Sequence, residues 1–318
     1  MVPRRELRRP GRPVVRLALL ALCFAGCDGG GSPGGDPGLV QVVCTTGQVA
    51  DLVENVGGEH VAVTALMGPG VDPHLYKATP GDRRALGGAE MVFYNGLHLE
   101  GRLAELLEKL AERRPAFAVV EEVRRDHPEL LLAVPGGEKV YDPHVWFDPE
   151  IWRRCTRFVA AKLAEHDPEH ADEYRKNAGA YVAKLDALER AWKERIAEIP
   201  EKSRVLVTAH DAFKYFGRAY GLEVHGLQGI STADEADLGA VNDLIELLVS
   251  REVKAVFVES SVPPKNVQSL VDGCRARDHE VKIGGELYSD AMGEAGTREG
   301  TYLGMVKHNV ETIVEALK

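Results

Sequence analysis

A polar, charged stretch near the middle of the chain constrains the fold more than any other feature. From Pro168 to Ile199 the only glycine is Gly179, and no proline follows Pro168. Its apolar residues recur at helical spacing: Tyr174, Ala178, Tyr181, Leu185, Leu188 and Trp192. A helix of this length spans on the order of 45 Å, enough to cross a whole domain. The stretch therefore predicts a stiff linking helix, residues 168–200.

Runs of β-branched residues alternate with helical patterns on both sides of this stretch. Before it, the predicted strands are 40–45, 61–66, 91–94 and 117–120, and the helices are one capped by Thr45 or Thr46 that ends before Gly57, then 80–86 and 103–113. After it, the strands are 205–207, 222–227, 255–259 and 281–283, and the helices are 213–220, 241–249, 265–274 and a last one from 302. Such alternation is typical of parallel sheets covered by helices. We therefore predict an α/β fold with two βα lobes of mostly parallel sheets, residues 39–167 and 201–318, joined by the long helix.

The first 38 residues have the character of an export and anchoring segment. Six arginines precede the apolar run Leu17–Phe24, which is far shorter than the roughly 20 residues of a membrane-spanning helix. Small residues stand directly before Cys27, so residues 1–26 are predicted to be a signal peptide and Cys27 a lipidation site, with a plain cleaved signal as the alternative. The Gly- and Pro-rich residues 27–38 are expected to form a flexible tether. We therefore expect an exported protein, lipid-anchored to the outer face of the cytoplasmic membrane.

The charge of the chain limits its partners. The full sequence has 39 basic and 49 acidic residues, and residues 1–26 hold six of the former and one of the latter, which leaves 33 against 48 and a formal charge of −15. A chain this acidic repels phosphate backbones and raises the local concentration of cations. Nucleic acid is therefore not an expected partner.

Three cysteines remain after the predicted signal and lipidation site, namely Cys44, Cys155 and Cys274. They are far apart in sequence and form no CxxC pair. Free cysteines are among the most buried residue types, so we expect small core residues, at most one disulfide, and no thiolate metal site.

Two near-identical elements, VDPHLY at 71–76 and YDPHVWFD at 141–148, each place a histidine directly after Asp-Pro. Proline fixes its own φ and keeps the preceding residue out of the α region, so His74 and His144 leave rigid turns in defined directions. A single such histidine is more often a solvated loop residue. Two copies in one predicted lobe favour a metal site, which requires rigidly aimed ligands.

The second half supplies two further candidate ligands. VLVTAHDAFKYF places His210 just past the end of a predicted strand, and GGELYSDAMGEAG places Asp290 in a loop after another strand. Loops at the carboxyl ends of strands are where open α/β sheets bind ligands. Three imidazoles and one carboxylate suit zinc, manganese, iron or nickel rather than copper(I) or calcium.

At these residues the chain resembles the TroA-like family of metal-binding receptors, in which two lobes are joined by one long helix. The resemblance covers residues 39–318 and is strongest in HDAFKYF, GISTADEADLG, FVESSVPPKN, GGELYSDAMG and GTREGTYLGMVKHN. In that family the ligands are the His of the first DPH, the His of DPHxWxD, a His or Glu before the DAFxYF element, and the Asp of the SDAMG loop. These positions are His74, His144, His210 and Asp290 here, without departure. The resemblance implies that the four hold one divalent metal ion, Zn²⁺ or Mn²⁺.

The resemblance also implies a function. It indicates a monomeric, extracytoplasmic solute-binding protein that delivers its ion to the permease and ATPase subunits of an ABC importer. A metallohydrolase is one alternative, but it needs an open coordination position and a general base, and neither HExxH nor an H-x-E signature occurs, so we do not expect an enzyme. A lipid-anchored adhesin is a second alternative, which could coexist with transport.

Two features bear on the identity of the metal. Zinc importers of this family often carry a long His- and acid-rich loop between the first two ligands, whereas the segment before Tyr141 here is the short PGGEKV. His210, where the manganese-specific relatives have Glu, favours zinc instead. Both metals are therefore kept.

The remaining histidines lie in no shared motif and are expected to be surface or structural residues: His60, His98, His127, His166, His170, His225, His279 and His308. Glu259 and Glu286 are expected either to orient the ligands or to form ordinary structural hydrogen bonds.

Overall fold

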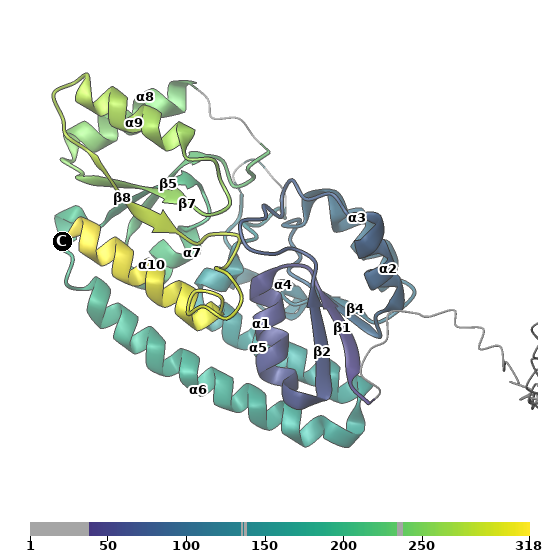
Figure 1. Ribbon diagram of the computed structural model, residues 1–318. Helices are drawn as coiled ribbons and strands as arrows, with labels where there is room; N and C mark the ends of the chain where they lie inside the picture. The colour runs from purple at the N-terminus through teal and green to yellow at the C-terminus, as the bar shows by residue number, and fades with distance from the viewer. Residues whose placement is uncertain (1–37, 135, 137–138, 234–237) are drawn as a thin grey trace, which may run out of the picture. The chain divides into compact units, whose positions relative to one another are not determined.

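The N-terminal half is built on a parallel four-stranded sheet. The structure, a computed structural model, describes residues 38–134, 136, 139–233 and 238–318 (Figure 1). The sheet has the order β2-β1-β3-β4 and is made of β1 Val40–Cys44, β2 Val61–Ala65, β3 Met91–Tyr94 and β4 Ala116–Ala118. All of its neighbouring strands run parallel, as predicted. The predicted signal peptide, the lipidation site Cys27 and the tether up to residue 37 lie outside the described residues.

Helices cover both faces of this sheet because its side chains alternate between two apolar clusters. Val42 and Cys44 face one cluster, which holds α1 Gly47–Gly57 and α5 Pro149–His166. Val43 and Val92 face the other cluster, which holds α2 Pro80–Gly88 and α3 Ala104–Ala111. The short α4 Glu121–Asp126 packs against α5.

Local sequence signals explain where these helices begin. Thr46 caps α1 by accepting from the backbone of Val49, and Thr79 and Asp82 form a capping box on α2. No element was predicted for residues 149–166, where α5 lies, or for residues 121–126, where α4 lies. The signals for the start of α5 were nevertheless in the sequence. Asp148 caps the helix by accepting from the backbone N–H groups of Glu150 and Ile151, and Pro149 takes the first helical position.

The C-terminal half repeats the strand–helix logic with two parallel strand pairs. They are β5 Val205–His210 with β6 Glu223–Gln228, and β7 Ala255–Glu259 with β8 Lys282–Leu287. β5 and β7 lie side by side. The helices are α7 Lys214–Tyr220, α8 Leu238–Ser250, α9 Lys265–Arg275 and α10 Tyr302–Leu317. α8 and α9 share a core with β5, and α7 and α10 cover the other side.

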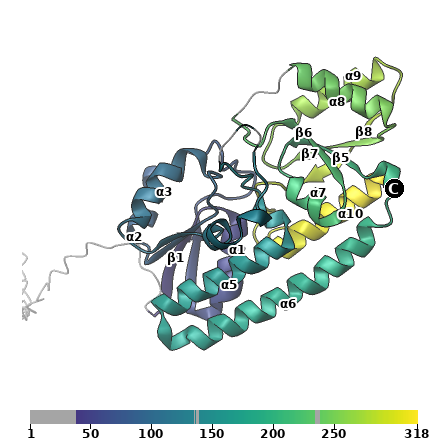
Figure 2. The same cartoon turned by 180° about the vertical axis from the view of Figure 1, so that it is seen from behind.

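The long helix was predicted over residues 168–200, and the structure places it as α6, Ala171–Ile196, after a 3-10 turn. It packs along α1 and α5 of the first half and along α7 and α10 of the second (Figure 2). Its buried side chains belong to one apolar cluster that continues through both halves. The helix therefore supports both halves through a shared core, and α5 runs beside it in the first half.

The remaining differences from the sequence analysis are at element ends. β5 runs on to His210, so this residue ends a strand instead of following it. β4 starts one residue earlier and ends two residues sooner than expected, and β8 extends to Leu287. Short 3-10 turns occur at Gly58–His60, Gly101–Leu103, Pro128–Leu130, Val145–Phe147, Pro168–His170 and Glu201–Ser203.

The cysteines behave as core residues. Cys44, Cys155 and Cys274 are buried, as expected for free cysteines, and the one disulfide that the sequence allowed is not formed among them. Burial raises the pKa of the Cys44 and Cys155 thiols well above the usual range, so neither is a ready thiolate ligand. Among the described residues, we find no helix with the length and apolar character needed to cross a bilayer.

Candidate metal centre

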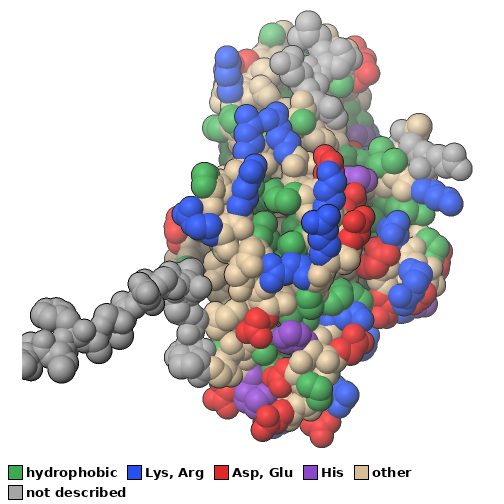
Figure 3. Space-filling model, turned by 90° about the vertical axis from the view of Figure 1, so that its right-hand side faces the viewer, with side chains coloured by type: hydrophobic (Ala, Val, Ile, Leu, Met, Phe, Trp, Pro, Cys, Tyr) green, Lys and Arg blue, Asp and Glu red, His purple; other side chains and the backbone are tan. Residues whose placement is uncertain are grey.

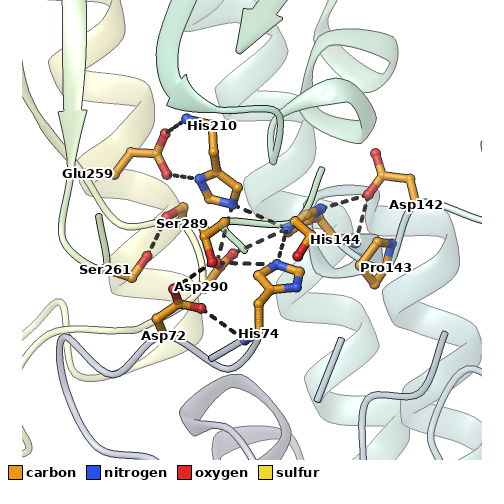
Figure 4. Close-up of polar contacts among 12 residues, drawn as sticks. Asp72, His74, Asp142, Pro143, His144, His210, Glu259, Ser261, Ser289 and Asp290 are labelled. Carbon is orange, nitrogen blue, oxygen red and sulfur yellow. Dashed lines mark hydrogen bonds and ion pairs between the residues drawn. The ribbon is translucent and has the colours of Figure 1, made fainter. Parts of the chain in front are cut away.

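Four buried side chains from four segments meet between the two halves (Figure 4). His74 lies in the loop between β2 and α2, His144 precedes the turn before α5, His210 ends β5, and Asp290 follows β8. Each offers one ligand atom, and these atoms all lie within 4.8 Å of one another. The structure thus brings together all four predicted ligands.

The three imidazoles point the same nitrogen at one place. His144 Nε2 lies 3.4 Å from His74 Nε2 and 3.4 Å from His210 Nε2. Asp290 completes the group, with Oδ1 3.4 Å from His144 Nε2 and Oδ2 3.2 Å from His210 Nε2 and 3.7 Å from His74 Nε2. Exposure is 6% for His74, 2% for Asp290 and zero for the other two.

The carboxylate of Asp290 gives the clearest chemical signal. Within the part of the chain that the structure describes, neither of its oxygens has a donor in hydrogen-bond geometry. A buried carboxylate is strongly unfavourable unless it is paired or binds a cation, and the charges that Asp290 faces at ion-pair distance are the three imidazoles, which are themselves candidate metal ligands. Three nitrogens and one carboxylate oxygen at this spacing match the donor set of zinc and related divalent metals.

The first Asp-Pro-His loop fixes its histidine through the backbone. Asp72 Oδ1 accepts from the His74 N–H at 2.9 Å, and Asp72 Oδ2 accepts from the Thr232 hydroxyl of the other half at 2.6 Å. Gly101, at φ +36°, packs against this loop, where a Cβ would stand 2.4 Å from the His74 carbonyl oxygen. Only glycine allows this close approach.

The second loop orients its imidazole directly. Asp142 Oδ1 accepts from the His144 N–H at 2.9 Å and lies 2.7 Å from its ring Nδ1. A proton held on Nδ1 by this contact leaves Nε2 as the nitrogen that faces the site.

Glu259 supports His210 in a similar way. Its Oε1 accepts from the His210 N–H at 2.8 Å, and its Oε2 lies 2.6 Å from the ring Nδ1. Glu259 is thus placed to orient a ligand. Glu286 is not, because its side chain is exposed, and its backbone carbonyl accepts from His308.

Contacts across the two halves hold the Asp290 loop. The carbonyl of Ser289 accepts from Gln48 Nε2 and from Trp146 Nε1, both at 3.2 Å. Since Gln48 and Trp146 belong to the N-terminal half, Asp290 is positioned by the half that carries His74 and His144.

Burial and charge divide the imidazoles into two kinds. Burial opposes a charge on His144, but the carboxylates of Asp142 and Asp290 outweigh it and raise its pKa to about 9. Burial likewise opposes a charge on His210, but the carboxylates of Glu259 and Asp290 outweigh it and raise its pKa well above the usual range. Burial lowers the pKa of His74 to about 4. These shifts favour a proton on His144 and His210 in the metal-free site and a neutral His74, so an incoming metal must displace protons from the first two.

Comparison with known proteins identifies the family. Residues 42–316 match the family described as ZnuA, zinc-uptake complex component A periplasmic. The chain belongs to the ZnuA family. The predicted resemblance to TroA-like receptors is confirmed, and membership in a solute-binding family excludes the metallohydrolase alternative.

Relatives of this chain in the ZnuA family are named for different metals. The manganese-binding lipoprotein MntA of Bacillus subtilis is 49% identical over 305 residues, which cover 96% of this chain and 97% of MntA. The solved structure of the periplasmic zinc-binding protein TroA from Treponema pallidum is 48% identical, with a TM-score of 0.84 over 88% of this chain and 99% of TroA. The metal ABC transporter substrate-binding lipoprotein SsaB of Streptococcus sanguinis is 31% identical over 95% of this chain and 97% of its own length.

The roles of Asp72 and Asp142 were not predicted from the sequence. The Asp of each Asp-Pro-His was expected only to form part of a turn. The available signal was spacing, because an Asp two residues before a backbone N–H commonly accepts from it.

The other histidines lie outside the centre. Glu59, His60 and Glu173 also bring ligand atoms within 4.8 Å, but both carboxylates are exposed, and His60 pairs with Glu173 at 2.7 Å and stacks on His170. These are surface contacts of the kind expected for them.

Proposed function

We propose that this chain captures a divalent transition metal ion, Zn²⁺ or Mn²⁺, between its two halves and delivers it to an ABC importer. The observation that carries the proposal is the buried group His74, His144, His210 and Asp290, which we assign as the ligands. Membership in a family of ABC transporter substrate-binding components implies a permease partner.

The finer parts of the proposal follow from the sequence. We infer a signal peptide at residues 1–26, a lipid on Cys27, a tether at 27–38, and lobes at 39–167 and 201–318 joined by residues 168–200. The relatives named as lipoproteins support export and anchoring. The chain acts as a monomer, and the ATPase subunit of the importer supplies the energy of transport.

Metal binding should stabilise the fold, because the ligands meet only in the native state. Bound metal contributes RT ln(1 + [L]/Kd), about 4 kcal/mol at roughly 1,000 times Kd. The basic test is a melting temperature, measured after chelation, that rises on addition of zinc or manganese. A melting temperature that ignores both metals would count against the function.

His210 provides the test of metal preference. Imidazole favours zinc, whereas manganese gains relatively more from a second carboxylate. We expect His210→Glu to lower zinc affinity relative to manganese affinity, and His210→Ala to weaken both. Competitive titration at fixed pH measures the ratio, and an unchanged ratio in His210→Glu with both metals still bound would remove His210 from the ligand set. Elemental analysis of protein purified from its native host identifies the physiological metal.

A further inference from the structure

A basic hollow lies on the outer surface of the N-terminal half. Its volume is about 540 Å³, and its lining consists of Lys77, Ala78, Arg83, Arg102, Leu103 and Leu106. Three cations thus face one concavity that has no acidic residue in its lining. In a chain with 49 acidic and 39 basic residues, such a site is a patch of positive potential on an otherwise acidic protein.

The three cations are uncompensated. Among the described residues, none of Lys77, Arg83 and Arg102 forms an ion pair with a carboxylate. The neighbouring acids are already engaged, since Asp82 accepts from Tyr76 and Thr79. On the other side, Glu105 pairs with Lys109. The positive charge of the hollow is therefore available to an outside partner.

Exposed apolar side chains gather near the same place. Across the described ranges, four large apolar residues stand out as exposed: Leu75, Leu106, Val140 and Ile283. Leu106 lines the basic hollow, Leu75 lies between His74 and Lys77, and Val140 lines a neighbouring hollow. Figure 3 shows Lys and Arg side chains gathered around apolar ones on the face that carries α2 and α3. Apolar groups rimmed by charge are typical of a protein interface.

The basic hollow adjoins the opening of the metal centre. The neighbouring hollow, of about 600 Å³, is lined by His74 and Gly101 together with residues of both halves. Gly101 packs on the His74 backbone, and the next residue, Arg102, lines the basic hollow. A partner seated on the cations would therefore cover the side from which His74 is reached.

Resting on the function proposed above, we propose that the basic hollow with Leu75 and Leu106 docks the importer, and that the occupant is an acidic segment on the outer surface of its permease. Charge complementarity selects carboxylates as the recognised group. Concavity distinguishes this occupant from a membrane, because a hollow that converges three cations fits protruding side chains better than a plane of lipid headgroups.

The test uses the full protein and the permease–ATPase complex in nanodiscs of neutral lipid. The variant Lys77→Glu/Arg102→Glu changes the charge of the hollow by four. The matched control Lys176→Glu/Arg190→Glu makes the same change on exposed positions of α6. Metal affinity of every sample is measured first, by titration with zinc.

We expect all three proteins to bind zinc equally, the hollow variant to bind the complex at least about tenfold more weakly, and the α6 control to bind like the original. Equal docking by all three would overturn the docking proposal and leave the metal function standing. Loss of zinc binding in the original chain would instead overturn the proposed function.

A second arm separates the permease from a lipid surface. Vesicles with anionic lipid and no permease are mixed with the same three proteins. Binding of the original chain to vesicles, lost in the hollow variant, with no difference on neutral nanodiscs would assign the hollow to lipid and overturn the proposal.

Discussion

The two Asp-Pro-His loops share a local geometry and use it differently. In both, the aspartate accepts from the N–H of the histidine at 2.9 Å. Asp142 then turns its carboxylate on the ring of His144, whereas Asp72 binds Thr232 of the opposite half. The Asp142 loop orients the imidazole of His144, and the Asp72 loop links His74 to the opposite half of the protein.

Burial and nearby charge explain why the two histidines differ in protonation. His144 is fully buried beside two carboxylates, which keep a proton on it at neutral pH. At His74 burial is the largest influence, and it outweighs the nearby Asp290 carboxylate and lowers the pKa to about 4. The same three-residue turn can therefore serve orientation or closure, according to what lies opposite the aspartate.

The largest expected difference between the loops is in the metal-free protein. His144→Ala leaves the buried Asp142 carboxylate without its imidazole partner, so we expect the free energy of unfolding to fall by about 3 kcal/mol. His74→Ala keeps both contacts of Asp72 and should lower it by about 1 kcal/mol or less. Chemical denaturation after chelation measures both, with His98→Ala as the control. Equal losses would end the distinction.

The next largest difference is expected between the effects of the two aspartates on metal affinity. Asp142→Asn weakens the hold on the His144 ring, and loss of such a supporting contact typically lowers metal affinity by about 10- to 100-fold. Asp72→Asn removes no hydrogen bond from the His74 ring, so we expect it to lower metal affinity by less than about tenfold. Zinc titration against a competing chelator gives the numbers, and a larger effect for Asp72→Asn would reverse the assigned roles.

The pH dependence sharpens the comparison. The pKa of His144 is raised to about 9 from an ordinary value of 6.5, so its stabilisation of the metal-free fold is complete below about pH 6.5 and is lost as pH rises through about 9. Metal must displace this proton, so His144 should make metal affinity rise by up to about tenfold per pH unit between about pH 7 and 9, and the proton on His210 adds to that rise.

Calorimetry in buffers of different ionisation enthalpy counts the protons released. We expect Asp142→Asn to release fewer protons than the original chain at pH 7, and Asp72→Asn to match it. No proton release from the original chain would mean that His144 is neutral before metal arrives.

The smallest expected effect concerns dissociation. Thr232→Val removes the hydroxyl that binds Asp72 across the cleft, and a typical hydrogen bond contributes about 1 kcal/mol. We expect zinc to leave several-fold faster, measured by stopped-flow with a chelator, and Thr232→Ser to restore the original rate. If Thr232→Val leaves the rate unchanged, the hydrogen bond has no role in closure.

The sequence was most informative where chemistry is local. His74, His144, His210 and Asp290 could be chosen because they stand in motifs at strand ends or after fixed turns. The partners of Asp72 and of the Asp290 loop could not, because Thr232, Gln48 and Trp146 lie 140 or more residues away in sequence from the groups they contact. Such pairings depend on how the halves pack, which periodicity does not encode.

The long helix could be predicted and its setting could not. Residues 168–199 carry an uninterrupted helical pattern, but nothing local says that α5 lies beside it. The apolar spacing of Ile151, Cys155 and Val159 was an unused signal.

The 26 residues of α6 also act as a lever. At 1.5 Å per residue its arm is about 39 Å, so a tilt of one half by about 3° about the opposite end displaces that half by about 2 Å. That displacement equals the length of one metal–nitrogen bond, roughly 2.0–2.1 Å. A receptor built on such a helix can release its ion through a tilt too small to change its overall shape.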